Sequence, residues 1–292
     1  MIRDDLKAGR LPVPKTVEIL LGDAQHLLDD LAPASVQSCV TSPPYWGLRD
    51  YGHDEQFGAE SSPQQYVDDL VHLFRKVRRA LSDDGTLWLN IGDGYARNGG
   101  VGRHGPNAQV ANTKKDIQKR NLRVPSTWGL KDRDLMGIPW RVAFALQEDG
   151  WILRSRITWV KRAPMPESVK NRPSNATEDV FLFAKSAHYY YDNSGFREES
   201  GANLRNYWIL GPDTTSGGHP AAFPRELAKR CILLGSRPGD IILDPFAGSG
   251  TTGVAAAELD RSAILMEINP DYVELAQSRL ETSTLARLVR SG

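Results

Sequence analysis

The stretch Thr41-Ser42-Pro43-Pro44-Tyr45-Trp46 fixes how the rest of the chain is interpreted. It ends a short run with β-branched residues, Val36 to Thr41, which predicts a strand. The two prolines exclude both a helix and a continued central strand, so the chain must leave the sheet in a rigid turn. The turn therefore holds a hydroxyl, a carbonyl and two aromatic rings at the carboxyl end of a strand, where ligands bind in open α/β sheets.

A second stretch, Asp244-Pro245-Phe246-Ala247-Gly248-Ser249-Gly250-Thr251-Thr252-Gly253, lies near the other end of the chain. It joins a predicted strand, 240–243, to a predicted helix, 251–259. Its glycines satisfy the pattern Gly-x-Gly-x-x-Gly, which allows tight turning and close approach of the backbone to a nucleotide. Glu267 ends the next predicted strand and is placed to accept hydrogen bonds from ribose hydroxyls.

These glycines make a nicotinamide dinucleotide a real alternative, and two observations argue against it. Asp244 and Phe246 place an acid and a bulky ring where a pyrophosphate would lie, and an acid there suits a cationic ligand. A dehydrogenase also leaves the stretch from Ser42 to Tyr45 without a role.

Together, the two stretches resemble the amino-methyltransferase family that modifies DNA on cytosine N4 or adenine N6. The family's catalytic motif is Ser/Asp/Asn-Pro-Pro-Tyr/Phe/Trp and its cofactor motif is Asp-Pro-Phe-Ala-Gly-Ser-Gly-Thr, and both stand here almost letter for letter. The order of the motifs, catalytic first, resembles the circularly permuted β group. The resemblance covers most of the chain and is weakest over 95–134 and 165–218. It implies a Rossmann-like α/β methyltransferase fold and the cofactor S-adenosyl-L-methionine.

The predicted elements alternate, which indicates an α/β sheet, and we treat 1–292 as one methyltransferase domain. Predicted strands are 17–21, 36–41, 86–91, 151–160, 178–184, 240–243 and 262–266; predicted helices are 24–31, 63–81, 140–148, 225–234, 251–259 and 270–280. Residues 188–191 are expected to pair with 178–184 as a hairpin. The resemblance implies a seven-stranded sheet whose first, second and third strands are 240–243, 262–266 and 17–21, with the two termini close together.

The resemblance also implies roles in the cofactor site. The residues that line the methionine part would be Asp244, Phe246, Gly248 and Gly250. Glu267 would hold the ribose and Asp23 would accept a hydrogen bond from the adenine amine, although Gly-Asp after a strand is also an ordinary turn. Thr251 is assigned to the same site, with capping of the helix as its alternative role.

An exocyclic amine is a poor nucleophile because its lone pair is delocalised into the ring. Acceptors for its hydrogens localise that lone pair, and Ser42 Oγ and the Pro43 carbonyl are two acceptors in a turn that Pro44 makes rigid. Tyr45 would stack on a base that has left the duplex. Trp159 is a candidate second stacking face, with a core aromatic as the alternative.

Methylation at cytosine C5 would need an activated cysteine, and Cys39 lies inside a predicted strand instead. In the family, Ser before Pro-Pro is typical of cytosine-N4 enzymes, whereas Asp or Asn is typical of adenine-N6 enzymes. Ser42 therefore favours cytosine N4, with adenine N6 as the alternative. An RNA or protein-amide methyltransferase and an inactive DNA-binding relative are more distant alternatives.

The overall charge is zero, from 36 basic and 36 acidic residues, but the segment 95–135 carries an excess of basic side chains. We expect there either a basic arm that follows DNA phosphates or a solvated insertion, and the two are compatible if the arm orders only on DNA. A target-recognition region is expected over 165–218. The predicted DNA contacts are Arg97, Arg103, Lys114, Lys115, Lys119, Arg120, Arg123, Lys170, Arg172 and Arg205. The expected partner is double-stranded DNA; a homodimer and a cognate restriction endonuclease stay open, as does the DNA sequence that is read.

Composition is that of a globular protein, with 40% hydrophobic and 25% charged residues. No run approaches the ~18 apolar residues of a membrane span, and no signal peptide is expected. The two cysteines, Cys39 and Cys231, have neither disulfide nor metal-ligand spacing and are expected to be small buried residues. We therefore expect no metal and a cytoplasmic protein, and the resemblance implies a bacterial, archaeal or phage origin.

Overall fold

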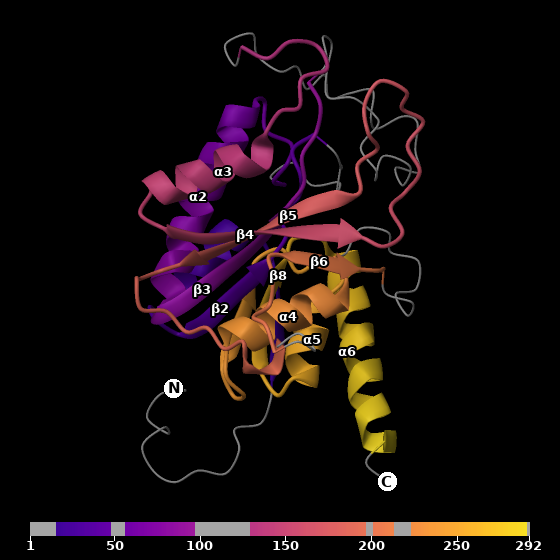
Figure 1. The fold of residues 1–292 in the computed structure, drawn as a ribbon. Helices are drawn as coiled ribbons and strands as arrows, with labels where there is room; N and C mark the ends of the chain where they lie inside the picture. Colours follow the sequence, from indigo (N-terminus) through magenta and orange to yellow (C-terminus); the bar gives the residue numbers. More distant parts are fainter. Residues whose placement is uncertain (1–15, 48–55, 97–128, 197–200, 213–222, 291–292) are drawn as a thin grey trace.

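A computed structural model describes residues 16–47, 56–96, 129–196, 201–212 and 223–290. Its centre is an eight-stranded sheet with helices on both faces (Figure 1). The strands are β1 Val17–Leu21, β2 Val36–Thr41, β3 Leu81–Ile91, β4 Ile152–Lys161, β5 Thr177–Ala184, β6 Tyr207–Leu210, β7 Ile241–Asp244 and β8 Ser262–Glu267. The helices are α1 Ala24–Leu27, α2 Pro63–Ala80, α3 Ile138–Glu148, α4 Arg225–Gly235, α5 Thr251–Glu258 and α6 Pro270–Arg290, with short 3-10 turns at η2 Leu28–Asp30 and η4 Ser194–Phe196.

The strands lie in the order β1-β8-β7-β2-β3-β5-β4-β6. The first five of these are parallel, β5 is antiparallel to both of its neighbours, and β6 is parallel to β4. Because β7, β8 and β1 are consecutive neighbours, the predicted first three strands are confirmed. Helix α6 contacts β1, so the first and last elements of the described chain lie side by side, as a permuted fold requires. Strand β6 adds an eighth strand at the edge, beyond the seven expected.

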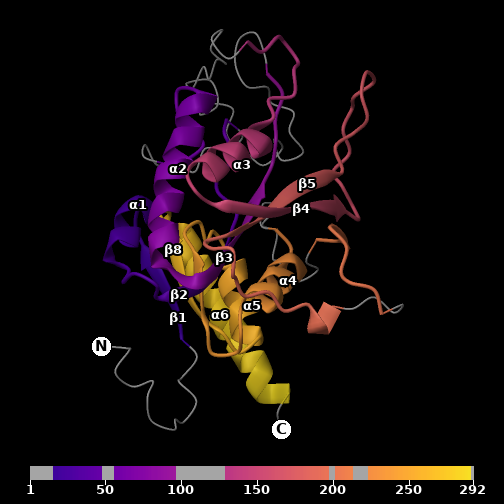
Figure 2. The ribbon, with the colours of Figure 1, turned by 60° about the vertical axis from the view of Figure 1, so that its left-hand side comes forward.

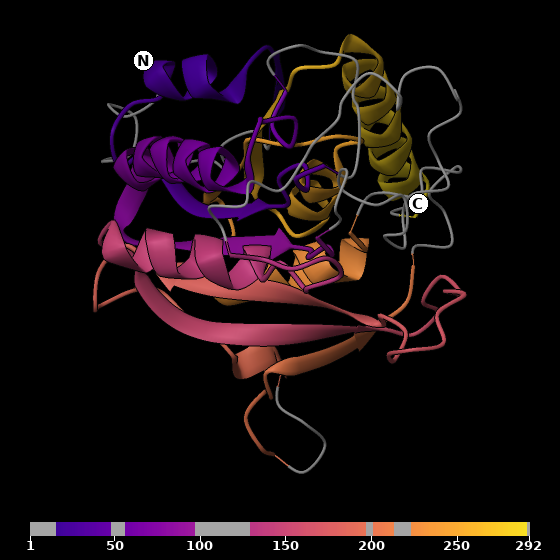
Figure 3. The same cartoon turned by 90° about the horizontal axis from the view of Figure 1, so that it is seen from above.

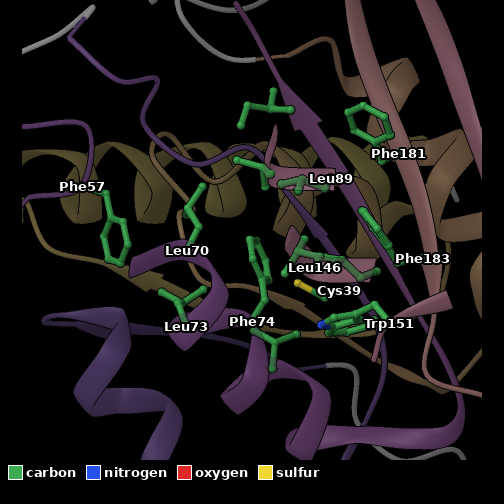
Figure 4. Packing of buried hydrophobic residues seen from close by; sticks show 14 of the residues in the cluster. Cys39, Phe57, Leu70, Leu73, Phe74, Leu89, Leu146, Trp151, Phe181 and Phe183 are labelled. Carbon is green, nitrogen blue, oxygen red and sulfur yellow. The ribbon is translucent and has the colours of Figure 1, made fainter. Parts of the chain in front are cut away.

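Alternate side chains along the central strands enter two separate cores. Leu87 and Leu89 of β3 belong to the core under α2 and α3, whereas Trp88 between them belongs to the core under α4 and α5. Figure 4 shows the first core, where Phe74, Leu146 and Trp151 gather around Cys39, and the pairs α2–α3 and α4–α5 can be followed in Figures 2 and 3. This alternation is what a sheet buried on both faces requires. Both cysteines are free and buried, as expected, and burial raises the pKa of each thiol.

The predicted hairpin between 178–184 and 188–191 is wrong. Both edges of β5 are already occupied, by β3 on one side and β4 on the other. The Tyr190 N–H instead donates to the Asp84 carbonyl at 2.8 Å, within the first part of β3. That part lies between the predicted helix, 63–81, and the predicted strand, 86–91. It is the irregular start of β3, where the pairing with β2 shifts between Val36 and Ser38.

The basic segment leaves the sheet after β3 and returns at the same place. Tyr95 forms a bridge with Leu135, and the Ala96 N–H donates to the Asp134 carbonyl at 2.8 Å. Most of the predicted arm lies outside the described residues.

The predicted target-recognition region includes β5, an interior strand of the sheet, and the edge strand β6. Within the described chain, no helix is long and apolar enough to cross a membrane.

Candidate active site

Both sequence motifs open into one pocket at the carboxyl ends of β1, β2, β7 and β8. Its empty volume is roughly 560 Å³, open solvent at the mouth included, which is in the range of small-molecule sites. It is lined by Gly22, Asp23, Ala24, Ser42, Pro44, Gln56, Phe57, Pro245, Phe246, Gly248, Met266, Glu267 and Ile268. Residues from both ends of the chain therefore face one ligand-sized space.

The predicted catalytic turn, residues 42–46, is held by hydrogen bonds on several sides. The Pro44 carbonyl accepts a 2.8 Å hydrogen bond from the Tyr66 hydroxyl of α2. The Trp46 indole N–H donates to the Glu60 carbonyl at 3.0 Å, and Trp46 itself is buried. The turn is therefore fixed from the helix layer and from the loop that follows it, as its prolines indicated.

Tyr45 points its hydroxyl toward the sheet. The hydroxyl donates to Glu178 Oε2 at 2.7 Å and lies 3.3 Å from Asn90 Oδ1, while Ser42 Oγ lies within 3.4 Å of the same phenol oxygen. The ring packs against the backbone of Gly92, where an added Cβ would overlap a ring carbon of Tyr45. Gly92 is thus required by the close approach of the Tyr45 ring.

Asp244 is not among the residues that line the pocket, and its predicted contact with the cofactor stays a prediction. Its carboxylate accepts hydrogen bonds from Thr41 Oγ1 at 2.7 Å, Thr252 Oγ1 at 2.6 Å and the Phe246 N–H at 3.1 Å. Only 1% of the residue is exposed, and this burial raises the pKa of the carboxyl. Asp244 therefore ties the two motifs together.

Side chains of α6 pack against the glycine-rich turn of the cofactor motif. A Cβ on Gly250 would lie 2.8 Å from Ala276 Cβ, so Gly250 serves the packing of α6 and does not line the pocket. The Arg279 guanidinium of α6 donates to the Ser249 carbonyl and hydroxyl, both at 2.6 Å, and to Thr251 Oγ1 at 3.2 Å. Thr251 is buried in these contacts and lies outside the lining, so its predicted cofactor role is not supported.

Glu267, Gly248 and Asp23 lie in the pocket as predicted. Glu267 accepts the Gly248 N–H at 2.7 Å and the Asn269 N–H at 2.9 Å, and burial raises the pKa of its carboxyl. Asp23 caps α1 by accepting the Gln25 N–H at 2.9 Å. Each carboxylate oxygen has a second lone pair, so both side chains retain capacity to bind a ligand.

Several residues that line the pocket were not predicted from the sequence. Phe57 packs edge-on against Phe246, with ring centroids 5.1 Å apart. Gln56, Met266 and Ile268 complete that side of the pocket. Met266 and Ile268 flank Glu267 and could have been inferred from that neighbour, whereas Gln56 and Phe57 lie in a polar loop that gave no signal.

Comparison with known proteins decides the family. The model of the N6/N4 DNA methylase family, described as DNA methylase, matches residues 36–278. The chain belongs to this DNA methylase family. It is 49% identical over 264 residues to the type II methyltransferase M.Cfr9I of Citrobacter freundii, covering 89% of this chain and 86% of the relative. It is 46% identical over 272 residues to M.SmaI of Serratia marcescens, covering 91% of each.

Solved structures agree with the methylase fold. The Thermus thermophilus protein TTHA0409, complexed with S-adenosyl-L-methionine, is 26% identical and superposes with a TM-score of 0.62 over 92% of this chain and 94% of that one. The cytosine-N4-specific PvuII DNA methyltransferase is 22% identical with a TM-score of 0.68, over 92% and 91% of the two chains, and supports the fold alone.

In this methylase, Trp159 is a core residue. It is 7% exposed, belongs to the core under α4, and donates its indole N–H to the Leu210 carbonyl at 3.4 Å. Strand alternation does not tell a pocket-facing aromatic from one that is buried under a helix. The predicted stacking role for Trp159 is therefore not supported, whereas Tyr45 remains beside Ser42.

The predicted DNA contacts fall into two groups. Arg97, Arg103, Lys114, Lys115, Lys119, Arg120 and Arg123 lie outside the described residues. Lys170 and Arg205 are exposed, but Arg172 stacks over the Tyr95 ring at 4.3 Å and pairs with Glu167 at 2.8 Å. Arg172 thus holds its own loop against the base of the basic segment.

Proposed function

We propose that this methylase binds S-adenosyl-L-methionine in the pocket and methylates the N4 amine of a cytosine flipped out of a specific sequence in double-stranded DNA. The observation that carries the proposal is the shared pocket: Ser42 and Pro44 of the catalytic turn line the same space as Asp23, Gly248 and Glu267. The cofactor and the target amine would thus come into contact where Ser42 and Pro44 line the pocket.

The chemistry of the lining fits this cofactor. None of the lining residues of the described chain is a lysine or an arginine, and Asp23 and Glu267 contribute carboxylates. A phosphate-bearing dinucleotide would lack cationic partners there, whereas an ammonium and a sulfonium would find negative charge. Phe57 and Phe246 form an apolar side for a purine ring. When bound, S-adenosyl-L-methionine supplies an electrophilic methyl group.

The turn provides acceptors for the target amine. Ser42 Oγ and the Pro43 carbonyl are held at the end of β2 by the contacts of Pro44 and Thr41. Accepting the N–H hydrogens localises the amine lone pair, and preorganised acceptors do so without reorganisation. Tyr45, with its ring against Gly92, provides the stacking face for the base.

Ser42 supports cytosine as the target, because serine before Pro-Pro is typical of the cytosine-N4 enzymes of the family. The type II relatives support a role beside a cognate restriction endonuclease of the same sequence specificity.

The test is mass spectrometry of nucleosides from unmethylated bacterial genomic DNA incubated with the protein and the cofactor. We expect N4-methylcytosine with the wild type and with the exposed control Ser278→Ala, and none with Ser42→Ala, which still binds the cofactor in calorimetry. N6-methyladenine would overturn the choice of base, and no methylated nucleoside would overturn DNA as the substrate.

A further inference from the structure

A polar network contacts the catalytic turn through residues that do not line the cofactor pocket. Its centre is Glu178, near the start of β5, whose side chain is 9% exposed. Glu178 Oε1 pairs with Lys161 Nζ, at the end of β4, at 2.5 Å. Glu178 Oε2 accepts the Tyr45 hydroxyl at 2.7 Å and the Asn90 amide at 3.2 Å. Burying two charges costs desolvation free energy unless both are well paired, so an ion pair at this position is more than a surface contact.

The direction of these hydrogen bonds bears on Ser42. Tyr45 has a single hydroxyl proton, and the short contact to a carboxylate, which can only accept, commits that proton to Glu178. The phenol oxygen is then left as an acceptor, and Ser42 Oγ lies 3.4 Å away as its donor. The proton of Ser42 is therefore drawn toward the sheet, and its lone pairs are left toward the pocket.

Lys161 holds the acid in place. Its ammonium lies 5.2 Å from the centroid of the Trp159 ring as well as against Glu178. Trp159 and Glu178 are paired neighbours on β4 and β5, so the aromatic ring and the ion pair lie on the same face of the sheet. The buried Trp159 thus supports the cation that fixes the acid.

We propose that Glu178, anchored by Lys161, is a positioning residue for methyl transfer: through Tyr45 it fixes the stacking ring and orients the Ser42 hydroxyl as an acceptor for the target amine. This rests on the proposed function of the same site. Replacing Glu178 by Gln retains its shape, but the amide oxygen would face Lys161 and the NH2 group would face the Tyr45 hydroxyl. The donor would then meet a donor, and the chain to Ser42 would lose its direction.

The test is a double-mutant cycle on the full-length protein, with the cofactor, in a steady-state methylation assay. We expect Glu178→Gln and Tyr45→Phe each to lower kcat by about ten- to a hundredfold, with KM for DNA and the calorimetric Kd for S-adenosyl-L-methionine changed less than about threefold. The double variant should be no slower than the slower single variant, because both changes break one chain. Glu258→Gln, which breaks an ion pair with Arg225 and Lys229 on α4, is the matched control and should keep wild-type kcat.

Multiplying losses in the double variant, or unchanged kcat in Tyr45→Phe, would overturn the positioning role. Tyr45→Phe removes one oxygen only, so the kcat of this variant tests the positioning role even if Glu178→Gln fails to fold. An inactive wild type would instead overturn the proposed function, and this proposal with it.

Discussion

The hydroxyl of Thr41 donates a 2.7 Å hydrogen bond to Asp244, across 203 positions of the chain. Thr41 directly precedes Ser42, the proposed catalytic residue, and Asp244 opens the proposed cofactor motif. The contact joins β2 to β7, which are parallel neighbours in the sheet. The spacing between the two sequence motifs is thus set by one buried pair, and Thr252 of α5 donates to the other carboxylate oxygen at 2.6 Å.

Thr41→Val is expected to destabilise the protein by about 1–3 kcal/mol, because it keeps the shape but leaves a buried carboxylate oxygen short of one donor. Urea unfolding followed by circular dichroism measures the change. Thr282→Val, at an exposed position on α6, is the matched control and should stay within about 0.5 kcal/mol of the wild type. Equal stability of the two variants would show that the Thr41 hydrogen bond contributes nothing.

Stability should fall as the pH rises because of Glu60. Burial raises the pKa of its carboxyl from 4.5 to about 7, although Oε1 accepts the Gly58 N–H; Oε2 is buried without a hydrogen-bond partner in the described chain. The folded state holds the proton more tightly than the unfolded state. The stabilisation is therefore complete below about pH 4.5 and is lost as the pH rises to about 7, by at most roughly 3 kcal/mol.

Glu60→Gln should remove this pH dependence, because the amide oxygen can still accept the Gly58 N–H and no charge forms. Melting temperatures between pH 4 and 8 measure it, with Glu281→Gln, an exposed change on α6, as the control. The same slope in Glu60→Gln and in the wild type would refute the assignment to Glu60.

The sequence was sufficient where a side chain's role follows from its neighbours in the chain. The strand ending at Thr41, the prolines after it and the acid at the end of β8 placed Ser42 and Glu267 correctly at one edge of the sheet. The order of the strands around β7 followed from the resemblance of the two motifs to those of the family.

The sequence was not sufficient where the role depends on distant partners. Asp244 has the position of a pocket acid until Thr41 and Thr252 are seen to surround it. Glu178 gave no signal, because its partner Tyr45 lies 133 positions away and a charged residue near a strand end is ordinarily solvated. The hairpin after β5 failed for the same reason: local pattern cannot show that both edges of a strand are already paired.

Glu267→Gln is expected to weaken S-adenosyl-L-methionine binding by about ten- to a hundredfold. The carboxylate accepts two backbone N–H groups, from Gly248 and Asn269, and an amide would turn its NH2 group toward one of them. The loop would loosen and the negative charge would be lost. Isothermal titration calorimetry measures the Kd, and the exposed Glu274→Gln on α6 should bind like the wild type. Unchanged affinity in Glu267→Gln would place the cofactor elsewhere.

The two glycines of the cofactor loop should differ in what an added methyl group costs. Gly248 and Gly250 both have positive φ, +51° and +76°, so alanine at either position strains the backbone by about 1–2 kcal/mol. A Cβ at Gly248 meets nothing within 4 Å, whereas at Gly250 it lies 2.8 Å from Ala276 Cβ of α6. Gly250→Ala should therefore be less stable than Gly248→Ala by a further ~1–3 kcal/mol in urea unfolding. Adding Ala276→Gly removes the opposing methyl and should recover most of that difference, so the two changes should couple in a double-mutant cycle. Additive effects would mean that α6 shifts to accommodate the methyl group, and equal stabilities of the two single variants would mean that the backbone strain alone decides.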